Sequence, residues 1–247
     1  MKVALFSTCL GDQLYPHVVR ATARVLVRFG CEVTTLAAAT CCGQPAWNSG
    51  YAPEARQMAR RFVETYAAAT HVVSPSGSCC GMIHHYYAEL FKADPGLQRE
   101  ALGVVEKVRE LSQFMVGVLG VDKLAGSFPH RVTYHPSCHG SRLLGARAEP
   151  LQLLRAIADL ELVPLDHAED CCGFGGTFAI KLAPISLAMV DEKAANIVKT
   201  NARYCVSTDL GCLMNISGRM RARGTNVEAL HLAELLDRAL AAGSGAS

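Results

Sequence analysis

The sequence lacks the features that define several large classes of protein. Its net charge is only +2 and its lysines and arginines are scattered, so no basic stripe predicts binding to nucleic acid or to an acidic membrane surface. The first residues, MKVALFSTCLG, hold too short an apolar run for a signal peptide. The uncharged stretch 33–53 contains Gln, Asn, Gly and Pro, which excludes a membrane span. We therefore expect a cytoplasmic protein with no membrane span.

Motifs for nucleotide binding and for hydrolysis are also missing. The glycine-rich run GFGGT at 173–177 matches neither the dinucleotide-binding G-x-G-x-x-G pattern nor the P-loop. No paired carboxylates and no Ser–His–Asp arrangement stand out, so hydrolytic chemistry is not predicted. Hydrophobic residues make up 50% of the 247 residues, which is ample for a buried core without disulfides.

Cysteine is abundant, and it is arranged twice in the same pattern. Eight of the eleven cysteines form two copies of C…CCG…C. The first cysteine set is Cys9, Cys41, Cys42 and Cys79, and the second cysteine set is Cys138, Cys171, Cys172 and Cys212. The spacing before the CC pair is 32 residues in one set and 33 in the other, and the spacing after it is 37 and 40 residues.

Eight cysteines in register indicate a metal site. Soft thiolates are the ligands of iron–sulfur clusters and of zinc, whereas a disulfide between adjacent cysteines is strained. The glycine after each pair lets backbone N–H groups approach the sulfur atoms, and such hydrogen bonds tune a cluster. Three other cysteines are predicted to pack as small buried side chains: Cys80, and also Cys31 and Cys205, which we expect in strands away from the cysteine sets.

The duplication extends to the expected strands and helices. Short strands are predicted from Val3 and Val132, and then at 31–36, 71–74, 161–165 and 204–207. Helices are predicted at 17–29, 53–69, 149–160 and 184–200. The segments 108–111 and 227–230 correspond to each other and each precedes a final amphipathic helix.

This alternation predicts an α/β fold of two tandem Rossmann-like repeats. Each repeat is expected to be a small parallel sheet flanked by helices, and the two are related by pseudo-two-fold symmetry. Gly126, Ser127 and Pro129 interrupt the pattern, so we place a boundary near 125–128 and expect domains at 1–126 and 127–247. Ligands of such folds bind at the carboxyl ends of the strands. Each cysteine set is therefore expected to gather there in one cluster-sized pocket.

Five segments carry a resemblance to a known family. They are TCCGQPAWNSGY at 40–51, PSGSCCGMI at 75–83, YHPSCHGSR at 134–142, DCCGFGGTFA at 170–179 and STDLGCLMNI at 207–216. The chain resembles the cysteine-rich CCG-domain iron–sulfur oxidoreductases, and among them the lactate-utilisation type. The resemblance implies an electron-carrying subunit with one iron–sulfur centre per repeat. It also implies a complex with a second iron–sulfur protein and a third small protein, which together oxidise L-lactate to pyruvate.

The chain departs from the family pattern at one position in each repeat. The pattern ends in C-x-x-C, but its first cysteine is replaced by Ser76 in one copy and by Asp209 in the other. Each set therefore offers four thiolates, which suffice for a 4Fe–4S cluster or for tetrahedral zinc. The Asp209 carboxylate has two possible roles, as an oxygen ligand or in an Asx turn before Cys212, and the turn is the commoner one.

A few other polar and aromatic residues stand beside the cysteines. His139 and Arg142 are weak catalytic candidates, because an imidazole can move a proton and a guanidinium can hold a carboxylate. His135 shares the roles open to His139, namely ligation, proton transfer or substrate binding. Trp47 and Asn48 lie in the first CCG loop and are expected to shield the site from water.

The leading hypothesis is an iron–sulfur electron-transfer subunit of a system that oxidises a 2-hydroxy acid, most plausibly L-lactate. Because the sequence has no flavin motif, the substrate is expected to be oxidised in the complex and the isolated subunit to be inactive. Two alternatives remain open. One is thiol–disulfide reduction at the cluster, and the other is a non-enzymatic zinc-stabilised scaffold that docks redox partners.

Overall fold

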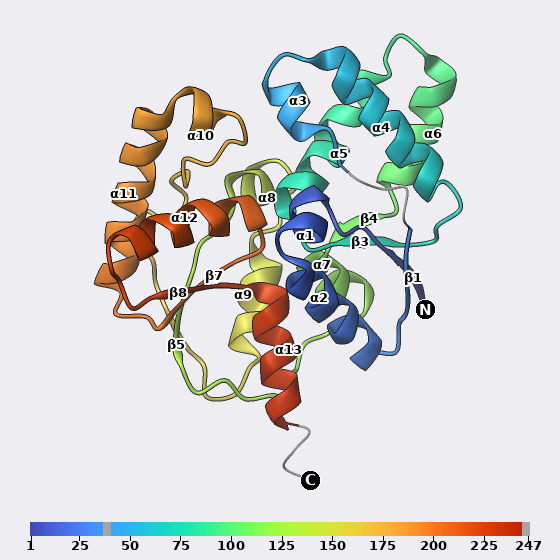
Figure 1. The fold of residues 1–247 in the computed structure, drawn as a ribbon. Helices are drawn as coiled ribbons and strands as arrows, with labels where there is room; N and C mark the ends of the chain where they lie inside the picture. The colour runs from blue at the N-terminus through green and yellow to red at the C-terminus, as the bar shows by residue number, and fades with distance from the viewer. Residues whose placement is uncertain (37–40, 244–247) are drawn as a thin grey trace.

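Two parallel sheets of four strands each organise the chain (Figure 1). The computed structural model describes residues 1–36 and 41–243. The strand orders β2-β1-β3-β4 and β6-β5-β7-β8 are the same topology, so the expected tandem α/β architecture is confirmed. The strands are β1 (Lys2–Leu5), β2 (Glu32–Thr35), β3 (Val72–Ser74), β4 (Val108–Glu110), β5 (Arg131–Tyr134), β6 (Glu161–Val163), β7 (Tyr204–Ser207) and β8 (Glu228–His231).

Helices cover both sheets and place the cysteines. The four predicted helices correspond to α2 (Pro16–Arg28), α4 (Ala52–Tyr66), α9 (Ala148–Arg155) and α11 (Ala183–Lys199). The other long helices are α5 (Gly77–Leu90), α6 (Pro95–Val105), α12 (Leu210–Ala222) and α13 (Leu232–Gly243). Short helices are α1 (Cys9–Gln13), α3 (Gln44–Asn48), α7 (Leu111–Gln113), α8 (Cys138–Arg142), α10 (Phe178–Lys181) and the π-turn η1 (Phe114–Val118).

Local sequence explains the clearest of these helices. Proline at the first position of α2 has the φ angle of a helix and no N–H to leave unsatisfied. The buried side chains Val18, Ala21, Val25 and Leu26 recur at helical spacing and turn one face of α2 to the core. Gly30, with φ of 76°, follows the end of the helix.

The register of the sheets corrects one correspondence that the sequence suggests. Val72 of β3 pairs with Val108, and Cys205, which holds the equivalent place in β7, pairs with Ala229. Val108 is therefore equivalent to Ala229 rather than to Val227, a shift of two residues. The shift makes Glu110 and His231 equivalent, each at the end of the last strand of its sheet.

The two halves pack on each other reciprocally. Helix α13 of the second half packs on α2 of the first, and α7 of the first half packs on α9 of the second. Likewise α1 packs on α12, and α5 packs on α8 (Figure 1). Exchanging the halves converts each contact into its counterpart, which is the mark of two-fold symmetry.

A single buried cluster spans both halves, including Val25 from the first and Leu235 from the second. The sheets lie on either side of the boundary expected at 126/127, and the division into domains at that point stays a prediction. Within the described residues, every helix is too short or too polar to span a lipid bilayer.

Candidate metal centre

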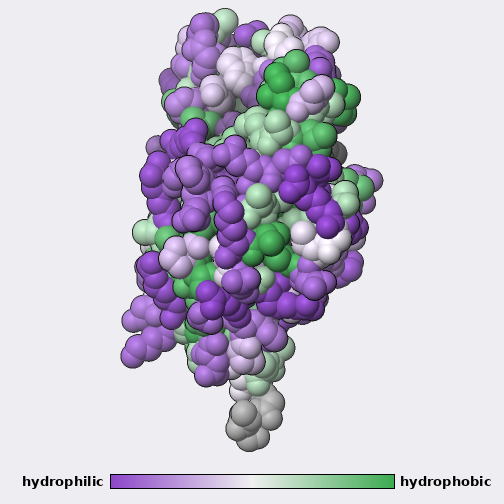
Figure 2. Space-filling model, turned by 90° about the vertical axis from the view of Figure 1, so that its left-hand side faces the viewer, coloured by the Kyte–Doolittle hydropathy of each residue, from purple (hydrophilic) through white to green (hydrophobic). Residues whose placement is uncertain are grey.

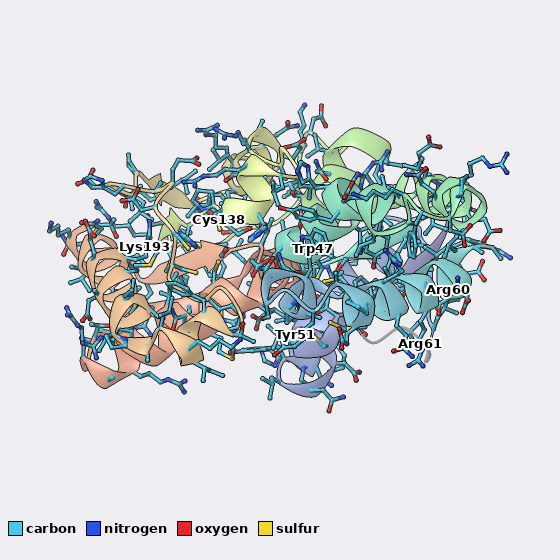
Figure 3. The ribbon with its side chains drawn as sticks, turned by 90° about the horizontal axis from the view of Figure 1, so that it is seen from above. Trp47, Tyr51, Arg60, Arg61, Cys138 and Lys193 are labelled. Carbon is cyan, nitrogen blue, oxygen red and sulfur yellow. The ribbon has the colours of Figure 1, made fainter. Side chains whose placement is uncertain are left out.

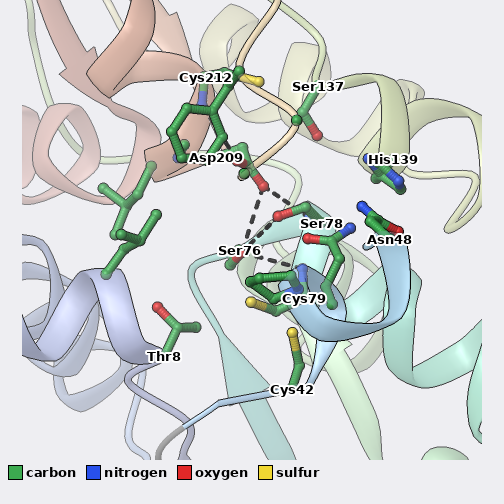
Figure 4. Close-up of a pocket in the computed structure, with 18 of the residues that line it drawn as sticks. Thr8, Cys42, Asn48, Ser76, Ser78, Cys79, Ser137, His139, Asp209 and Cys212 are labelled. Atoms are coloured by element: carbon green, nitrogen blue, oxygen red, sulfur yellow. Dashed lines mark hydrogen bonds between the residues drawn. The ribbon is translucent and has the colours of Figure 1, made fainter. Parts of the chain in front are cut away.

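All eight cysteines of the two sets line one cavity of about 180 Å³. The cavity lies where the carboxyl ends of both sheets meet, so the structure brings together the residues that the repeat singles out. Figure 4 shows Cys42 and Cys79 pointing toward each other on one side of the cavity and Cys212 on the opposite side. The expected pockets of the two sets are thus continuous with each other.

The cysteines are placed by the first turns of four helices. Cys9 and Cys138 begin α1 and α8, while Cys79 and Cys212 are the third residues of α5 and α12. Each helix is capped by the side chain just before it, which accepts a hydrogen bond from a first-turn N–H group. The caps are Thr8, Ser76, Ser137 and Asp209. The polar residues before the cysteines are therefore explained by helix capping.

The thiols of each set contact one another in the same order. In the first set the hydrogen-bonded chain runs from Cys9 through Cys41 and Cys42 to Cys79. In the second set it runs from Cys138 through Cys171 and Cys172 to Cys212, with the last two sulfur atoms 3.2 Å apart. All eleven cysteines are free thiols, so no disulfide competes with this arrangement among the described residues.

One cysteine in the middle of each row of thiols, Cys41 or Cys171, is favoured as a thiolate. Hydrogen bonds from the thiols of Cys42 and Cys9 lower the pKa of Cys41 to about 3. The same contacts from Cys138 and Cys172 lower the pKa of Cys171 to about 2. A thiolate is the form of cysteine that binds metal, so these contacts favour metal binding by each set.

Glycine after each CC pair has two roles. The N–H groups of Gly43 and Gly173 both lie 3.4 Å from the sulfur two residues earlier, as the sequence predicts. Both glycines have left-handed φ angles, of 87° and 80°. A side chain at Gly173 would also come within 2.7 Å of the Ser186 carbonyl oxygen, because the loop packs closely on α11. Only glycine meets both demands.

The two residues that replace the family's extra cysteine act as caps and join the halves. Ser76 accepts a hydrogen bond from the N–H of Cys79. One Asp209 oxygen accepts from the N–H groups of Gly211 and Cys212, and the other accepts from Ser78 at 2.8 Å and from Ser76 at 3.4 Å (Figure 4). Of the two roles considered for Asp209, the hydrogen bonds match the turn, here an N-cap.

The residues behind the two sets differ sharply. Behind the first set, Phe6 packs edge-on against Phe62, with ring centroids 5.0 Å apart. The equivalent positions in the second half are His135 and Lys193. His135 stands three residues before Cys138, just as Phe6 stands three residues before Cys9. The second match comes from the glycines of the CCG loops, which touch Ala55 in the first half and Ser186 in the second. Phe62 and Lys193 each lie seven residues after that contact residue.

His135 and Lys193 are both buried, at 0% and 2% exposure. Burial, aided by the nearby Lys193 charge, lowers the pKa of His135 to about 3. Burial also lowers the pKa of Lys193, whose ammonium group donates to the carbonyls of His167 at 2.5 Å and Ala168 at 3.1 Å. Figure 3 shows Lys193 in the same half of the molecule as Cys138. Sequence reasoning missed Lys193, because the buried face of its helix also holds the polar residues Ser186 and Asn196 and gives no clear apolar pattern.

The two weak catalytic candidates lie in different places. His139 lines the cysteine cavity, and its Nδ1 atom is 3.6 Å from the sulfur of Cys138. The Arg142 side chain is exposed and donates to the Glu169 carbonyl at 2.6 Å. It borders a separate cavity that also touches Cys171. A joint role of His139 and Arg142 on one substrate is therefore not supported by the geometry.

The remaining candidates divide in the same way. Asn48 lines the cavity, whereas Trp47 packs against Tyr86 with ring centroids 5.3 Å apart and is not among its lining residues. Trp47 also packs against the buried cluster that contains Cys42 and Cys79, and its role in shielding the site stays a prediction. Cys80 is buried in the core, as expected. Cys31 is buried too, but it directly precedes β2 and does not lie in the strand as predicted. Cys205 lies in β7 but packs in the same buried cluster as Cys172 and Cys212, so it is closer to the second set than the sequence suggested.

Comparison with known proteins places this geometry in a family. Residues 3–84 and 132–217 each match the CCG family, described as a cysteine-rich domain. The fold is shared with a hypothetical protein from Helicobacter pylori, at a TM-score of 0.62 and 12% identity, covering 97% of this chain and 49% of that one. The class is therefore a protein of two CCG cysteine-rich domains.

Two relatives show to which group within this class the chain belongs. Lactate utilization protein A of Geobacillus thermodenitrificans (strain NG80-2) is 48% identical, over 96% of this chain and 99% of its own length. Lactate utilization protein A of Halalkalibacterium halodurans is 49% identical, over 96% of this chain and 97% of its own length. The chain belongs to the family of Lactate utilization protein A. Thr40, the first residue of one segment that carried the resemblance, lies outside the described residues.

Proposed function

We propose that this chain is an iron–sulfur electron-transfer subunit, with each cysteine set holding one cluster. The observation that carries the proposal is the pair of thiol chains, equivalent in order and lining one cavity. A 4Fe–4S cluster takes four cysteine thiolates, and when bound it would accept and release electrons. The two sets face a common space, which suits transfer of an electron from one centre to the other.

The residues present fit such a cluster. Each set supplies four thiols, and Gly43 and Gly173 add N–H···S hydrogen bonds of the kind that set cluster potentials. Asp209 and Ser76 are engaged as caps, so their oxygen atoms are already bonded to protein. The donor set is consequently rich in sulfur, which favours iron–sulfur clusters or zinc over hard cations.

The substrate system follows from the family. The relatives named Lactate utilization protein A support a place in the oxidation of L-lactate to pyruvate. That reaction removes two electrons and two protons, and we infer that they leave lactate within a complex that contains a second iron–sulfur protein and other subunits. In this proposal the chain is an oxidoreductase subunit of the cytoplasm that is inactive alone, and His139, at the cavity wall, is its best-placed group for contact with a small 2-hydroxy acid.

An exposed apolar surface near the cavity suits a protein partner. Ile180 of α10 is 82% exposed, and Leu182, Ile185 and Leu187 beside it are 46–53% exposed. Phe174, which comes shortly before this segment in the sequence, lines the cavity. Figure 2 shows apolar groups among polar ones on the face that carries α10 and α11. Apolar side chains bordered by polar ones are typical of a docking surface.

The test is anaerobic reconstitution of the purified chain with iron and sulfide. We expect a brown protein with two clusters and no formation of pyruvate from L-lactate with an artificial acceptor until the partner subunits are added. A colourless protein that binds only zinc would contradict the cluster assignment. Rapid pyruvate formation by the isolated chain, abolished by His139→Ala, would instead make this subunit the catalytic one.

A further inference from the structure

We propose that His135 supplies a nitrogen ligand to the metal centre of the second cysteine set. The inference rests on the proposed function, since it concerns the same centre. A ring nitrogen of His135 and the sulfur atoms of Cys172 and Cys212 all lie within 4.8 Å of one another. That spacing allows one metal atom or one small cluster to contact all three, because bonds from zinc, for example, to sulfur and nitrogen are about 2.0–2.3 Å long.

The imidazole of His135 has no other partner in the described structure. Both ring nitrogens are buried and make no hydrogen bond. A buried polar group without a partner is uncommon in proteins, because losing water without gaining a hydrogen bond is unfavourable. His231 provides the contrast: it is equally buried, but its Nε2 lies 3.0 Å from the Pro75 carbonyl and its Nδ1 accepts from the N–H of Ala233. A role as a metal ligand would explain why the ring nitrogens of His135, unlike those of His231, have no hydrogen-bond partner.

The backbone fixes His135 in place beside the cysteines. Its N–H donates to the Val206 carbonyl at 2.8 Å, at the end of β5, so the ring is held at the sheet edge where the second set gathers. The oxygen atoms of Asp209, the other nearby candidate for an additional ligand, are already bonded to N–H and O–H groups. A histidine therefore takes the extra ligand position that the aspartate does not fill.

Among the described residues, the first cysteine set has no such ligand. Phe6 holds the position equivalent to His135, and its ring packs against Phe62 and Tyr66. The two centres therefore differ: four cysteines bind the first, and four cysteines with one histidine bind the second. Ligand identity helps to set the potential of an iron–sulfur centre, so the two centres are expected to differ in reduction potential.

The experiment isolates the second centre in the full-length chain. Cys41→Ser with Cys42→Ser disables the first set, and the protein is reconstituted anaerobically with iron and sulfide and reduced. Pulsed electron paramagnetic resonance then compares unlabelled protein with protein carrying ¹⁵N only in the histidine rings. Backbone nitrogens stay unlabelled, so N–H···S hydrogen bonds cannot produce a ¹⁵N signal. Matched variants are His135→Phe, which copies the first half, and His139→Ala, which removes the other histidine near the cavity.

We expect a strong ¹⁵N coupling that persists in His139→Ala and disappears in His135→Phe. A coupling that is lost in His139→Ala would overturn the assignment. Iron and sulfide bound without any histidine coupling would overturn the ligand but leave the proposed function standing. Absence of bound iron would overturn both. If His135→Phe does not fold, as judged by circular dichroism of the metal-free chain, the coupling in labelled His139→Ala protein still decides the question, with His135→Gln as the second variant.

Discussion

The two halves of the molecule share a backbone plan and differ in what lies behind their cysteines. In the first half a cluster of aromatic rings, Phe6, Phe62 and Tyr66, closes the space behind the set. In the second half the positions of Phe6 and Phe62 are taken by His135 and Lys193. The strand order, the capped helices and the CCG loops are the same in both. Topology thus fixes where the thiols lie, while two interior positions set the polarity around them.

Whether the two cysteine sets bind iron independently is the first point to test, because the loss of iron should be the largest effect. Cys41→Ser with Cys42→Ser, or Cys171→Ser with Cys172→Ser, should each remove about half of the bound iron, since hydroxyl groups are poor ligands for it. Iron and sulfide analysis with spectra of the remaining centre measures this. Cys31→Ala is the matched control and should cost only about 1 kcal/mol of stability. Loss of all iron from either double variant would mean that both sets hold one shared centre.

The aromatic cluster of the first half should contribute to the stability of the fold. Phe62 is 2% exposed and touches Phe6, Tyr66 and Tyr87. Phe62→Ala should lower the free energy of unfolding by about 3–5 kcal/mol, because it leaves a large cavity. Denaturant unfolding of the metal-free chain measures the change. Phe29→Ala serves as a control at a partly buried site, and an equal loss there would argue against a special role of the aromatic cluster.

The ends of the last strands should respond to pH in opposite senses. Burial raises the pKa of Glu110 from 4.5 to about 7, so its contribution to stability is full below pH 4.5 and is lost as the pH rises through 7. Burial lowers the pKa of the equivalent His231 from 6.5 to about 4, so its contribution is full above pH 6.5 and is lost as the pH falls through 4.

The Glu110 side of this comparison is the simpler one to measure. Glu110→Gln should match the wild type at about pH 5 and exceed its unfolding free energy by about 2 kcal/mol at about pH 8, because an amide has no charge to bury. Thermal unfolding of the metal-free chain under reducing conditions measures the difference. A constant difference between the two proteins across this pH range would show that the carboxyl does not titrate there.

The charge of Lys193 should give the smallest of these effects. Its removal in Lys193→Met leaves the second centre without a nearby cation that favours the reduced, more negative state. The reduction potential of that centre should fall by roughly 60 mV, a tenfold change in a one-electron equilibrium. Potentiometric titration with Phe62→Met as the control at the equivalent position measures the shift. An equal change in both variants would show that packing, not charge, is responsible.

Sequence reasoning predicted the repeat, the strand and helix order and the cysteines that converge, because spacing in register survives without coordinates. Its errors have physical causes. The sequence alignment of the last strands, β4 and β8, is wrong by two residues. Val-Glu-Ala-Leu resembles Val-Arg-Glu-Leu in its side chains, but the hydrogen-bonded register pairs Ala229 with Cys205. Helix α6 went unnoticed, although Asp94 caps it and Pro95 begins it.

The candidate site was predictable only in part for a similar reason. The cysteines carry their own signal, but the role of Trp47 depends on a stacking partner, Tyr86, that lies far away in the sequence. The free nitrogens of His135 are equally invisible in a sequence, because they depend on what does not contact the ring. Lys193 becomes informative only after the close packing of Gly173 on α11 aligns it with Phe62.

The reciprocal packing of the halves has a consequence for how the molecule can vary. Helix α13 lies on α2 just as α7 lies on α9, which is how the two identical subunits of a homodimer bury each other. The chain is in effect a homodimer fused into one polypeptide. In an unfused homodimer every substitution occurs twice, so histidine and lysine would have entered both sites together. Fusion removes that constraint, and one site can keep its phenylalanines while the other gains an imidazole and an ammonium group.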